Sequence, residues 1–492
     1  MVRGTRAVTA RVRRRVDAGS PARPPAFGCT SRGSGEPSTR VGRRGYRDAM
    51  PPRWTVEQAL ALAPDASSAA AGRRLAASGS WTAAGAAPGV VWGSCAGSGK
   101  VPYQTVVDLT EPAFSCSCPS RKFPCKHALA LLVRWAGGEV AEHDEPADAA
   151  AAWLEARAAR AARSAERAEA RAERTTTTDP RPAERRAEQR EQRVSAGVAE
   201  LDRWLRDQVR TGVASADTAG YALTDPVAAR LVDAQAPGLA GAVRRLASVA
   251  ASGEGWPGRL LEELALVHLL TTAHRRLAEL PADLAATVRT RVGATVRTED
   301  VLAGPPVRDR WDVLALRDSS DGRLTTRRVH VRGAATGRDA LVLSFAGPGH
   351  VLDVSLVPGT ALDADLHFHP GALGLRAVVG ARHGEPCPLS AVTGVPVRHV
   401  LAAWARALAA DPWTSDLPVV LGDVHVLPAP DGAPAGWLVA DTAGDALPLV
   451  AAPGLWTVLA VSGGRPVTLV GALTPGGVRA EAVLPDGALV VV

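Results

Sequence analysis

Hydrophobic and polar positions alternate along this chain in different ways, and the first pattern covers residues 51–138. Residues 51–80 carry their large apolar side chains near helical spacing in an alanine-rich context. Two strand-like stretches follow, at 89–94 and 103–109, separated by the turn-forming sequence GSGK. After a cysteine-rich loop, the apolar run HALALLVRWA begins at His127 and predicts a helix. We therefore expect an N-terminal helix, then a unit made of two strands, a loop and a helix.

Residues 194–293 show a helical pattern in five successive segments. Pro226, Pro237, Pro257 and Pro281 fall where helices would start, which suits a residue with a fixed φ and no N–H. The pattern predicts an all-α domain.

Beyond residue 294 the pattern changes to short valine and leucine runs bounded by Gly, Pro and Asp turns. A single helix is expected there, at about 399–410. Residues 294–492 are therefore predicted to form a β-rich domain.

Residues 139–193 contain mostly Ala, Arg and Glu and almost no large apolar side chain. Such a stretch forms helix through propensity and Glu–Arg pairs but has little to bury, so it predicts a solvated linker, interrupted at TTTTDPRP. A chain of 492 residues also exceeds one hydrophobic core at roughly 150 residues per domain. The expected class is α+β multidomain: a small ββα finger, a helical middle domain and a β-rich C-terminal region.

The positive charge of the chain is concentrated at its start. The whole chain carries +7, and residues 1–50 carry +9 from twelve arginines and three acidic residues, which leaves −2 for the remainder. This first segment lacks apolar periodicity, so we expect it to be disordered or to precede a true start at Met50. A basic arm that binds nucleic acid is the functional alternative.

No secretory leader and no apolar run of eighteen residues is visible, which predicts a cytoplasmic protein. Three of the six cysteines crowd into ten residues, while Cys29, Cys95 and Cys387 are scattered. This distribution favours a metal site in a reducing compartment over a disulfide framework.

The crowded cysteines form the motif C-S-C-P-S-R-K-F-P-C-K-H, which places Cys116, Cys118, Cys125 and His127 in two closely spaced pairs. Three thiolates and an imidazole are a tetrahedral zinc set, and four protein ligands leave no position for water. We therefore expect one structural Zn²⁺ with no catalytic role. The alternative, chance cysteines or a local disulfide, leaves His127 without a purpose.

Cations surround this motif. The chain has only three lysines among its 57 basic residues, and Lys100, Lys122 and Lys126 all lie in or just before the finger. With Arg121 and Arg134 they form a candidate basic patch for a nucleic acid or a protein partner.

The spacing Cys-x-Cys, a short loop and Cys-x-His, between a two-stranded element and a helix, resembles the SWIM zinc finger over residues 88–137. The resemblance implies a module that binds DNA or proteins. It also implies a possible association with MoxR-type ATPase and von Willebrand A-type partners.

Three other groups of residues could carry chemistry. GSGK at 97–100 lacks the remaining residues of a phosphate loop, so a hairpin turn is expected. Asp363, Asp365, His367 and His369 would share one face of a strand, although an ordinary polar strand face explains them as well. His268 and His274 lie in one apolar helix and are expected to be packing or helix-end residues.

Three hypotheses for function follow. The first is a non-catalytic, zinc-stabilised adaptor for a protein partner, favoured because the chain beyond residue 50 is not basic. The second is a nucleic-acid-binding protein that uses the patch around the finger. The third is an enzyme with a site near His367 and His369. We expect no catalytic site.

Overall fold

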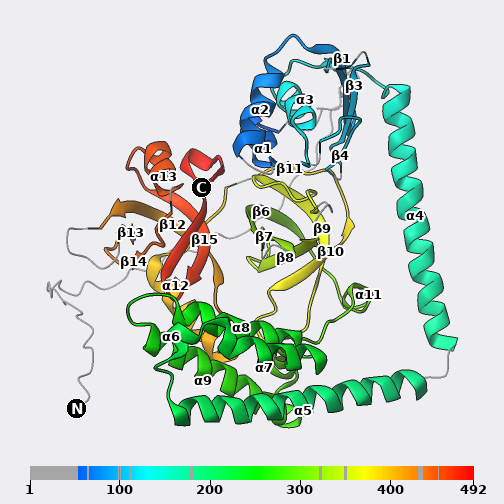
Figure 1. Cartoon of the computed structure of the whole chain (residues 1–492). Helices are drawn as coiled ribbons and strands as arrows, with labels where there is room; N and C mark the ends of the chain where they lie inside the picture. Colours follow the sequence, from blue (N-terminus) through cyan, green and yellow to red (C-terminus); the bar gives the residue numbers. More distant parts are fainter. Residues whose placement is uncertain are drawn as a thin grey trace, which may run out of the picture. The chain divides into compact units, whose positions relative to one another are not determined.

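The computed structural model describes residues 54–492 except for short gaps (Figure 1). The gaps are 64–65, 98, 100, 111, 121, 178–180, 321–323, 348–351, 390, 430–435 and 453. Residues 50–492 form one compact unit. The expected disordered segment or early start at 1–50 lies outside the described residues.

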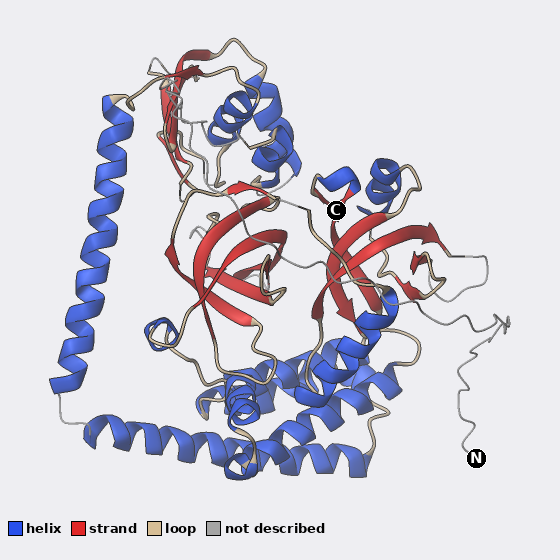
Figure 2. Ribbon diagram, turned by 180° about the vertical axis from the view of Figure 1, so that it is seen from behind, coloured by secondary structure: helices blue, strands red, loops and turns tan. Residues whose placement is uncertain are grey.

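The N-terminal domain is a five-stranded sheet with helices packed on it. The helices α1 and α2 precede the strands, and α3 follows the fourth strand. The elements are α1 Val56–Ala61, α2 Ala66–Ala76, β1 Trp81–Ala87, β2 Val90–Cys95, β3 Tyr103–Asp108, β4 Ala113–Cys116, α3 Lys126–Ala136 and β5 Ala141–Glu142. The strand order is β4-β3-β2-β1-β5, and Figure 2 shows helices on one face of this sheet.

Side chains of this sheet are buried on both faces because neighbours along a strand point in opposite directions. Val91 and Val107 join the core that contains α3. Val90 and Val106 instead join a second cluster with Ala150 of α4. The expected finger therefore belongs to a larger sheet, and β1 is an additional strand that pairs with β2 through the turn at Pro88 and Gly89.

The segment expected to be a solvated linker is helical, and its first turns are packed. It contains α4, Asp148–Thr177, and the first part of α5, Arg181–Thr211. Trp153 and Leu154 pack against the second face of the sheet, and Arg157 forms an ion pair with Asp108 at 2.8 Å. The linker prediction is wrong for these turns, and its expected end at residue 193 falls inside α5.

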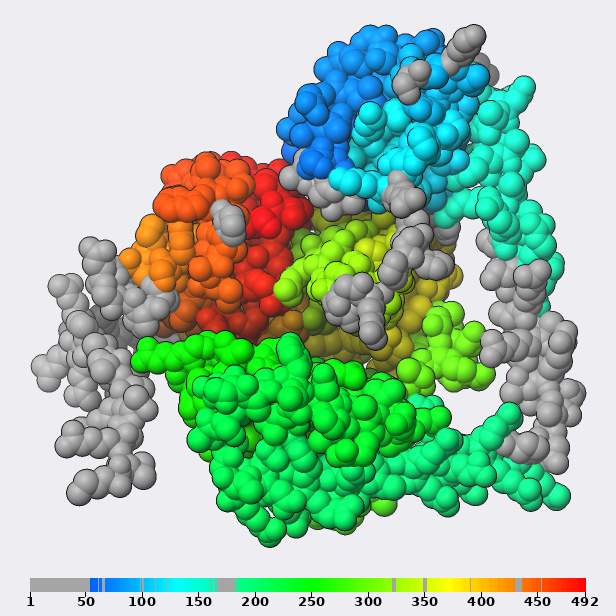
Figure 3. All heavy atoms as spheres, viewed as in Figure 1, coloured from blue at the N-terminus to red at the C-terminus, as the bar shows by residue number. Residues whose placement is uncertain are grey.

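The middle domain is helical, as predicted, and Figure 3 draws it as a closely packed green body. Its helices after α5 are α6 Ala216–Ala219, α7 Tyr221–Asp233, α8 Pro237–Ala250, α9 Trp256–Arg275, η1 Leu277–Glu279, α10 Ala282–Val292 and α11 Thr298–Leu302. Pro237 and Pro257 lie in first turns and Pro281 precedes α10, as expected. Pro226 lies inside α7, so the start predicted there is wrong: α7 begins after Gly220.

The β-rich region contains two sheets, and the first closes into a barrel. Its strands are β6 Val307–Ser320, β7 Thr325–Gly333, β8 Asp339–Ala346, β9 Thr360–Phe368, β10 Arg376–Arg382 and β11 Cys387–Pro388. Strands β6, β7 and β8 form an antiparallel meander, β10 pairs in parallel with β8, and β9 pairs with both β10 and β6. The β8–β10 pairing spans only two residue pairs, so the barrel is partly open.

The second sheet has the order β14-β13-β12-β15-β16-β17. Its region contains α12 Val397–Ala410, β12 Leu417–Pro428, β13 Trp437–Asp441, β14 Ala446–Pro448, α13 Gly454–Ser462, β15 Val467–Thr474, β16 Gly477–Leu484, η2 Pro485–Gly487 and β17 Val490–Val491. Helix α12 confirms the one expected near 399–410, whereas α13 was missed. A bulge in β6 places Val313 in the barrel core and Leu314 in a separate cluster with Val420 and Val470.

Among the described residues, no helix is both long enough and apolar enough to span a bilayer.

Candidate metal centre

A strand end and a helix start bring the four predicted ligands together. Cys116 is the last residue of β4, which pairs with β3, and Cys118 follows two residues later. Cys125 is the N-cap of α3, and His127 lies in the first turn of that helix. The chain between the two pairs therefore only has to span the gap from the sheet edge to the helix.

The donor atoms are spaced for one metal ion. The three Sγ atoms and one ring nitrogen all lie within 4.8 Å of one another. Cys116 Sγ and Cys125 Sγ lie 3.8 and 3.9 Å from His127 Nδ1. Zinc bonds of about 2.0–2.3 Å give tetrahedral edges of about 3.4–3.8 Å, so the cluster fits Zn²⁺ after a small contraction. The predicted structural zinc site is confirmed at this level.

The ligands are well covered. Cys125 and His127 are 5% exposed, and Cys116 and Cys118 are half-buried. The Tyr103 ring lies 4.9 Å from the His127 ring, measured between centroids. Because four protein ligands complete a tetrahedron, the set leaves no open coordination position and suits a structural ion.

Hydrogen bonds favour a thiolate at Cys116. Contact with the Cys125 thiol, together with His127 and the Thr105 hydroxyl, lowers the pKa of Cys116 to about 3 despite burial. The Thr105 hydroxyl donates to Cys116 Sγ at 3.3 Å. Interaction with Cys116, and then burial, raises the pKa of Cys125. Bound Zn²⁺ would supply the positive charge that keeps all three thiols ionised.

The apolar residues behind the ligands form one core. Leu129, Leu131 and Leu132 of α3 are fully buried there. Phe114 and Phe123 meet edge-on with centroids 5.6 Å apart, so the rings beside the ligands pack on each other. This core also contains residues from outside the finger: Trp54, Ala59, Leu62, Val354 and Val357. The finger is thus not the small self-contained unit that the sequence predicted.

Of the expected basic patch, the structure describes Lys122, Lys126 and Arg134. Lys100 and Arg121 lie outside the described residues. Arg134 is used within the domain, where it donates to the Ala76 carbonyl at 2.9 Å and lies 3.3 Å from Glu139. Lys122 and Lys126 are exposed and line one groove of about 500 Å³ beside the zinc ligands.

The structure does not assemble a site from the histidines and aspartates of β9. His367 Nδ1 lies 2.9 Å from the Gly304 carbonyl, and Asp363 pairs with Arg308. Asp365 lies 3.0 Å from His383. Among the described residues, the zinc ligands alone form a group of His, Cys, Asp or Glu that could hold a metal ion.

The remaining sequence predictions concern local structure. GSGK falls in the connection between β2 and β3, as expected for a hairpin. His274 is buried in the last turn of α9, as a helix-end residue should be, and lies 3.6 Å from Glu191. His268 is 45% exposed and lies 2.9 Å from Asp202, so it is not a core residue.

Two cavities were not predicted. One is an apolar groove of about 380 Å³ between α5 and α9, and the other is a cavity of about 750 Å³ beside the barrel. The sequence gives no sign of the groove, because it does not show that the apolar side chains of Val209 and Leu261 are exposed. The second unites residues that lie far apart in sequence, so no local pattern marks it.

Comparison with protein families gives two matches. Residues 106–136 match the SWIM zinc finger, and residues 189–292 match the SWIM-associated four-helix bundle domain. The first match covers the four ligands, and the second ends at the last residue of α10. No curated protein and no solved structure matches the chain.

Proposed function

Because the chain contains a SWIM zinc finger and a SWIM-associated four-helix bundle domain, we propose that it is a non-catalytic adaptor for another protein. Zinc stabilises the N-terminal domain, and the bundle docks the partner. One observation carries this proposal: the groove between α5 and α9 exposes large apolar side chains.

Apolar side chains from both helices line the groove. Leu205 and Val209 lie one turn apart on α5, and Leu261 and Ala265 lie one turn apart on α9. Val209 is 58% exposed and Leu261 is 55% exposed. Contiguous exposed apolar surface costs free energy in water, and on monomeric proteins it marks interaction sites. The parallel ridges of two helices suit an amphipathic helix of a partner.

Positive charge borders this groove. Arg206 and Arg210 line it, and no acidic residue does. Arg206 lies 3.0 Å from Asp202 and Arg210 lies 3.6 Å from Asp207, yet both guanidinium side chains stay more than half exposed. The expected partner is therefore an amphipathic helix whose apolar stripe is flanked by acidic residues. Candidates to test first are the MoxR-type ATPases and von Willebrand A-type proteins implied by the resemblance.

The experiment measures binding of the full chain to purified MoxR-type ATPase and von Willebrand A-type protein from the same organism. Val209→Asp should weaken the complex about tenfold or more, because a charge would enter the apolar groove. Val232→Asp is the matched control, since Val232 is 46% exposed on α7 and does not line the groove. Equal binding by both variants would exclude this groove as the docking site.

Nucleic-acid binding is the second candidate, favoured by the groove at the finger. Lys122 and Lys126 line it together with Tyr103 and Ser120, and no acidic residue lines it. Lys126 is also the first residue of α3, where the helix dipole favours an anion. Tyr103 could support stacking of a base.

Fluorescence anisotropy with a labelled DNA oligomer at several salt concentrations tests this candidate. Replacing both lysines by Gln should weaken binding and flatten the logarithmic salt dependence by about 2, since each phosphate contact contributes roughly 0.9. Arg134→Gln is the control because Arg134 is engaged within the domain. A salt slope unchanged by the lysine replacements would reject the candidate.

A further inference from the structure

The barrel has an architecture that is associated with a particular binding face. Five strands close in the order β6-β7-β8-β10-β9, with one weak parallel pairing between β8 and β10. A partly open, five-stranded Greek-key barrel is the architecture of the OB-fold. In OB-folds the second and third strands, with the loops after the first and fourth strands, bind oligonucleotides or oligosaccharides. Here these are β7, β8 and the loop at 369–375 after β9.

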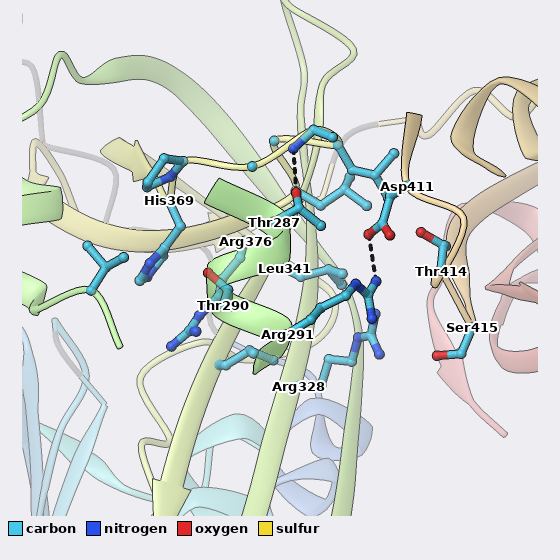
Figure 4. Close-up of a pocket in the computed structure, with 18 of the residues that line it drawn as sticks. Thr287, Thr290, Arg291, Arg328, Leu341, His369, Arg376, Asp411, Thr414 and Ser415 are labelled. Carbon is cyan, nitrogen blue, oxygen red and sulfur yellow. Dashed lines mark hydrogen bonds and ion pairs between the residues drawn. The ribbon is translucent and has the colours of Figure 1, made fainter. Parts of the chain in front are cut away.

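The 750 Å³ cavity lies on this face of the barrel. Arg328 of β7, Leu341 and Leu343 of β8, and the loop at 369–375 line it. Residues of α10 and the segment after α12 supply the opposite wall, and Figure 4 shows Arg291 and Asp411 meeting there. The volume falls within the range of about 300–1,000 Å³ that is typical of ligand pockets.

Uncompensated positive charge points to an anionic ligand. Arg291 pairs with Asp411 at 2.5 Å, and Arg328 forms two hydrogen bonds with Asp416. Arg317 and Arg376 also line the cavity, and neither has an acidic partner in the part of the chain that is described. An oligosaccharide would leave these two charges unpaired, whereas a phosphate would pair with them.

Two buried polar atoms in the wall lack a partner among the described residues. Thr414 is 8% exposed, and its hydroxyl has no hydrogen bond. The Nε atom of Arg291 is also buried and unpaired. In contrast, the Thr287 hydroxyl on the same wall donates to the Asp283 carbonyl and accepts from the Ala372 amide. Buried unpaired polar atoms cost about 1–3 kcal/mol each, which a bound ligand would relieve.

Basic side chains lie on one side of the cavity and hydroxyl side chains on the other, with an apolar side chain between them. Figure 4 shows His369 and Arg376 on one side, Thr414 and Ser415 on the other, and Leu341 between them. Burial and the nearby Arg376 guanidinium lower the pKa of His369 to about 4, so its ring is neutral at pH 7 and can donate or accept a hydrogen bond. A ligand with a phosphate, an apolar planar part and a polar edge would match the basic side, the apolar centre and the hydroxyl side of the cavity in turn.

We propose that this cavity binds a nucleotide, either free or as one unit of a single-stranded nucleic acid. Arg317 and Arg376 pair with the phosphate, and Leu341 and Leu343 contact the base. Thr414 and Arg291 bond to polar edges of the ligand. The proposal does not depend on the groove between α5 and α9, because the residues that line the two sites are different.

The experiment titrates the full chain with two probes, a fluorescent AMP analogue and a fluorescein-labelled dT12. Binding of either probe should weaken at least tenfold in the double variant Arg317→Ala, Arg376→Ala. For dT12 the logarithmic salt slope should also flatten by about 1.4, since each phosphate contact on a single strand contributes roughly 0.7. Arg406→Ala is the control, because Arg406 is an exposed arginine of α12 outside the cavity. Binding of the AMP analogue identifies a free-nucleotide site, and binding of dT12 alone identifies a single-strand site.

A second variant separates ligand binding from folding. Thr414→Val replaces an unpaired buried hydroxyl by a methyl group of similar size, so the melting temperature should stay equal or rise. Nucleotide affinity should nevertheless fall several-fold. Failure of both probes to bind, or unchanged affinity in the double arginine variant, would overturn the proposal.

Discussion

The zinc centre and the barrel cavity are assembled in opposite ways. The four zinc ligands lie within the twelve residues from Cys116 to His127, and a strand end and a helix start bring them together. The walls of the cavity come from residues as distant as Thr287 and Asp416. A site of the first kind can be identified in sequence because its chemistry is local. A site of the second kind exists only after three regions have folded.

The regions also differ in the interactions that stabilise them. The N-terminal domain joins its apolar core to a metal site, whereas the apolar cores of the bundle and the barrel adjoin no such site within the described residues. Loss of zinc should therefore damage one region far more than the others.

The largest expected effect is that of removing a zinc ligand. Cys125→Ser should abolish stoichiometric zinc and unfold the finger, because structural zinc contributes about 10 kcal/mol or more to folding. Mass spectrometry measures the zinc content of the variant. Limited proteolysis should show cleavage within the N-terminal domain while residues 194–292 stay protected.

Cys387→Ser is the matched control, since Cys387 is a half-buried cysteine of β11 outside the zinc cluster. Val354 and Val357 belong to the finger core, and Gln58 donates to the Gly359 carbonyl at 2.5 Å. Some loosening at the start of β9 should therefore accompany the loss of zinc. Full zinc occupancy in Cys125→Ser would contradict the assignment of that ligand.

Sequence patterns identified what is local and missed what is distant. The metal motif, the β2–β3 hairpin and the helices of the bundle follow from spacing, turn residues and apolar periodicity. Strand β1 was missed because its sequence WTAAGAA has little β propensity. Trp153 and Leu154 are too few to form a periodic stripe, yet they dock α4 on the sheet.

Barrel closure was beyond sequence reasoning for a related reason. It depends on the pairing of Arg376 and Ala377 with Leu341 and Val342, a parallel contact across a long connection. Such pairing is chosen by tertiary packing and leaves no local signal. For the basic patch, the sequence could not show that the Arg134 side chain is engaged with the Ala76 carbonyl.

A smaller effect is expected at Asp202, which tests whether apolar packing alone holds the bundle. Its carboxylate is 5% exposed and lies 2.8 Å from Arg275, 3.0 Å from Arg206 and 2.9 Å from His268. Burial alone would raise the pKa of Asp202, but the arginines outweigh it and hold the pKa below its usual value. Asp202→Asn should destabilise the bundle by about 2 kcal/mol at pH 7.

The pH dependence follows from this lowered pKa. The carboxylate contributes its full stabilisation above the unfolded pKa of about 3.9, and the contribution is lost as the pH falls through the folded pKa. Chemical denaturation between pH 7 and pH 3 should show a steeper loss in the wild type than in Asp202→Asn. Asp233→Asn, on the exposed side of α7, serves as the control. Parallel pH profiles for wild type and Asp202→Asn would show that the charge cluster is not stabilising.

The smallest expected effect concerns the basic side chains of the finger. It distinguishes those that stabilise the fold from those that would contact a ligand. Arg134 Nη1 donates to the carbonyl of Ala76, the last residue of α2, so Arg134→Ala should cost about 1 kcal/mol of stability. Zinc content and any DNA affinity should stay unchanged, whereas Lys126→Ala should leave stability unchanged because Lys126 is exposed. Thermal unfolding and a DNA titration of both variants provide the measurement. A loss of DNA affinity in Arg134→Ala without a loss of stability would mean that Arg134 contacts a ligand and that its bond to Ala76 contributes little to the fold.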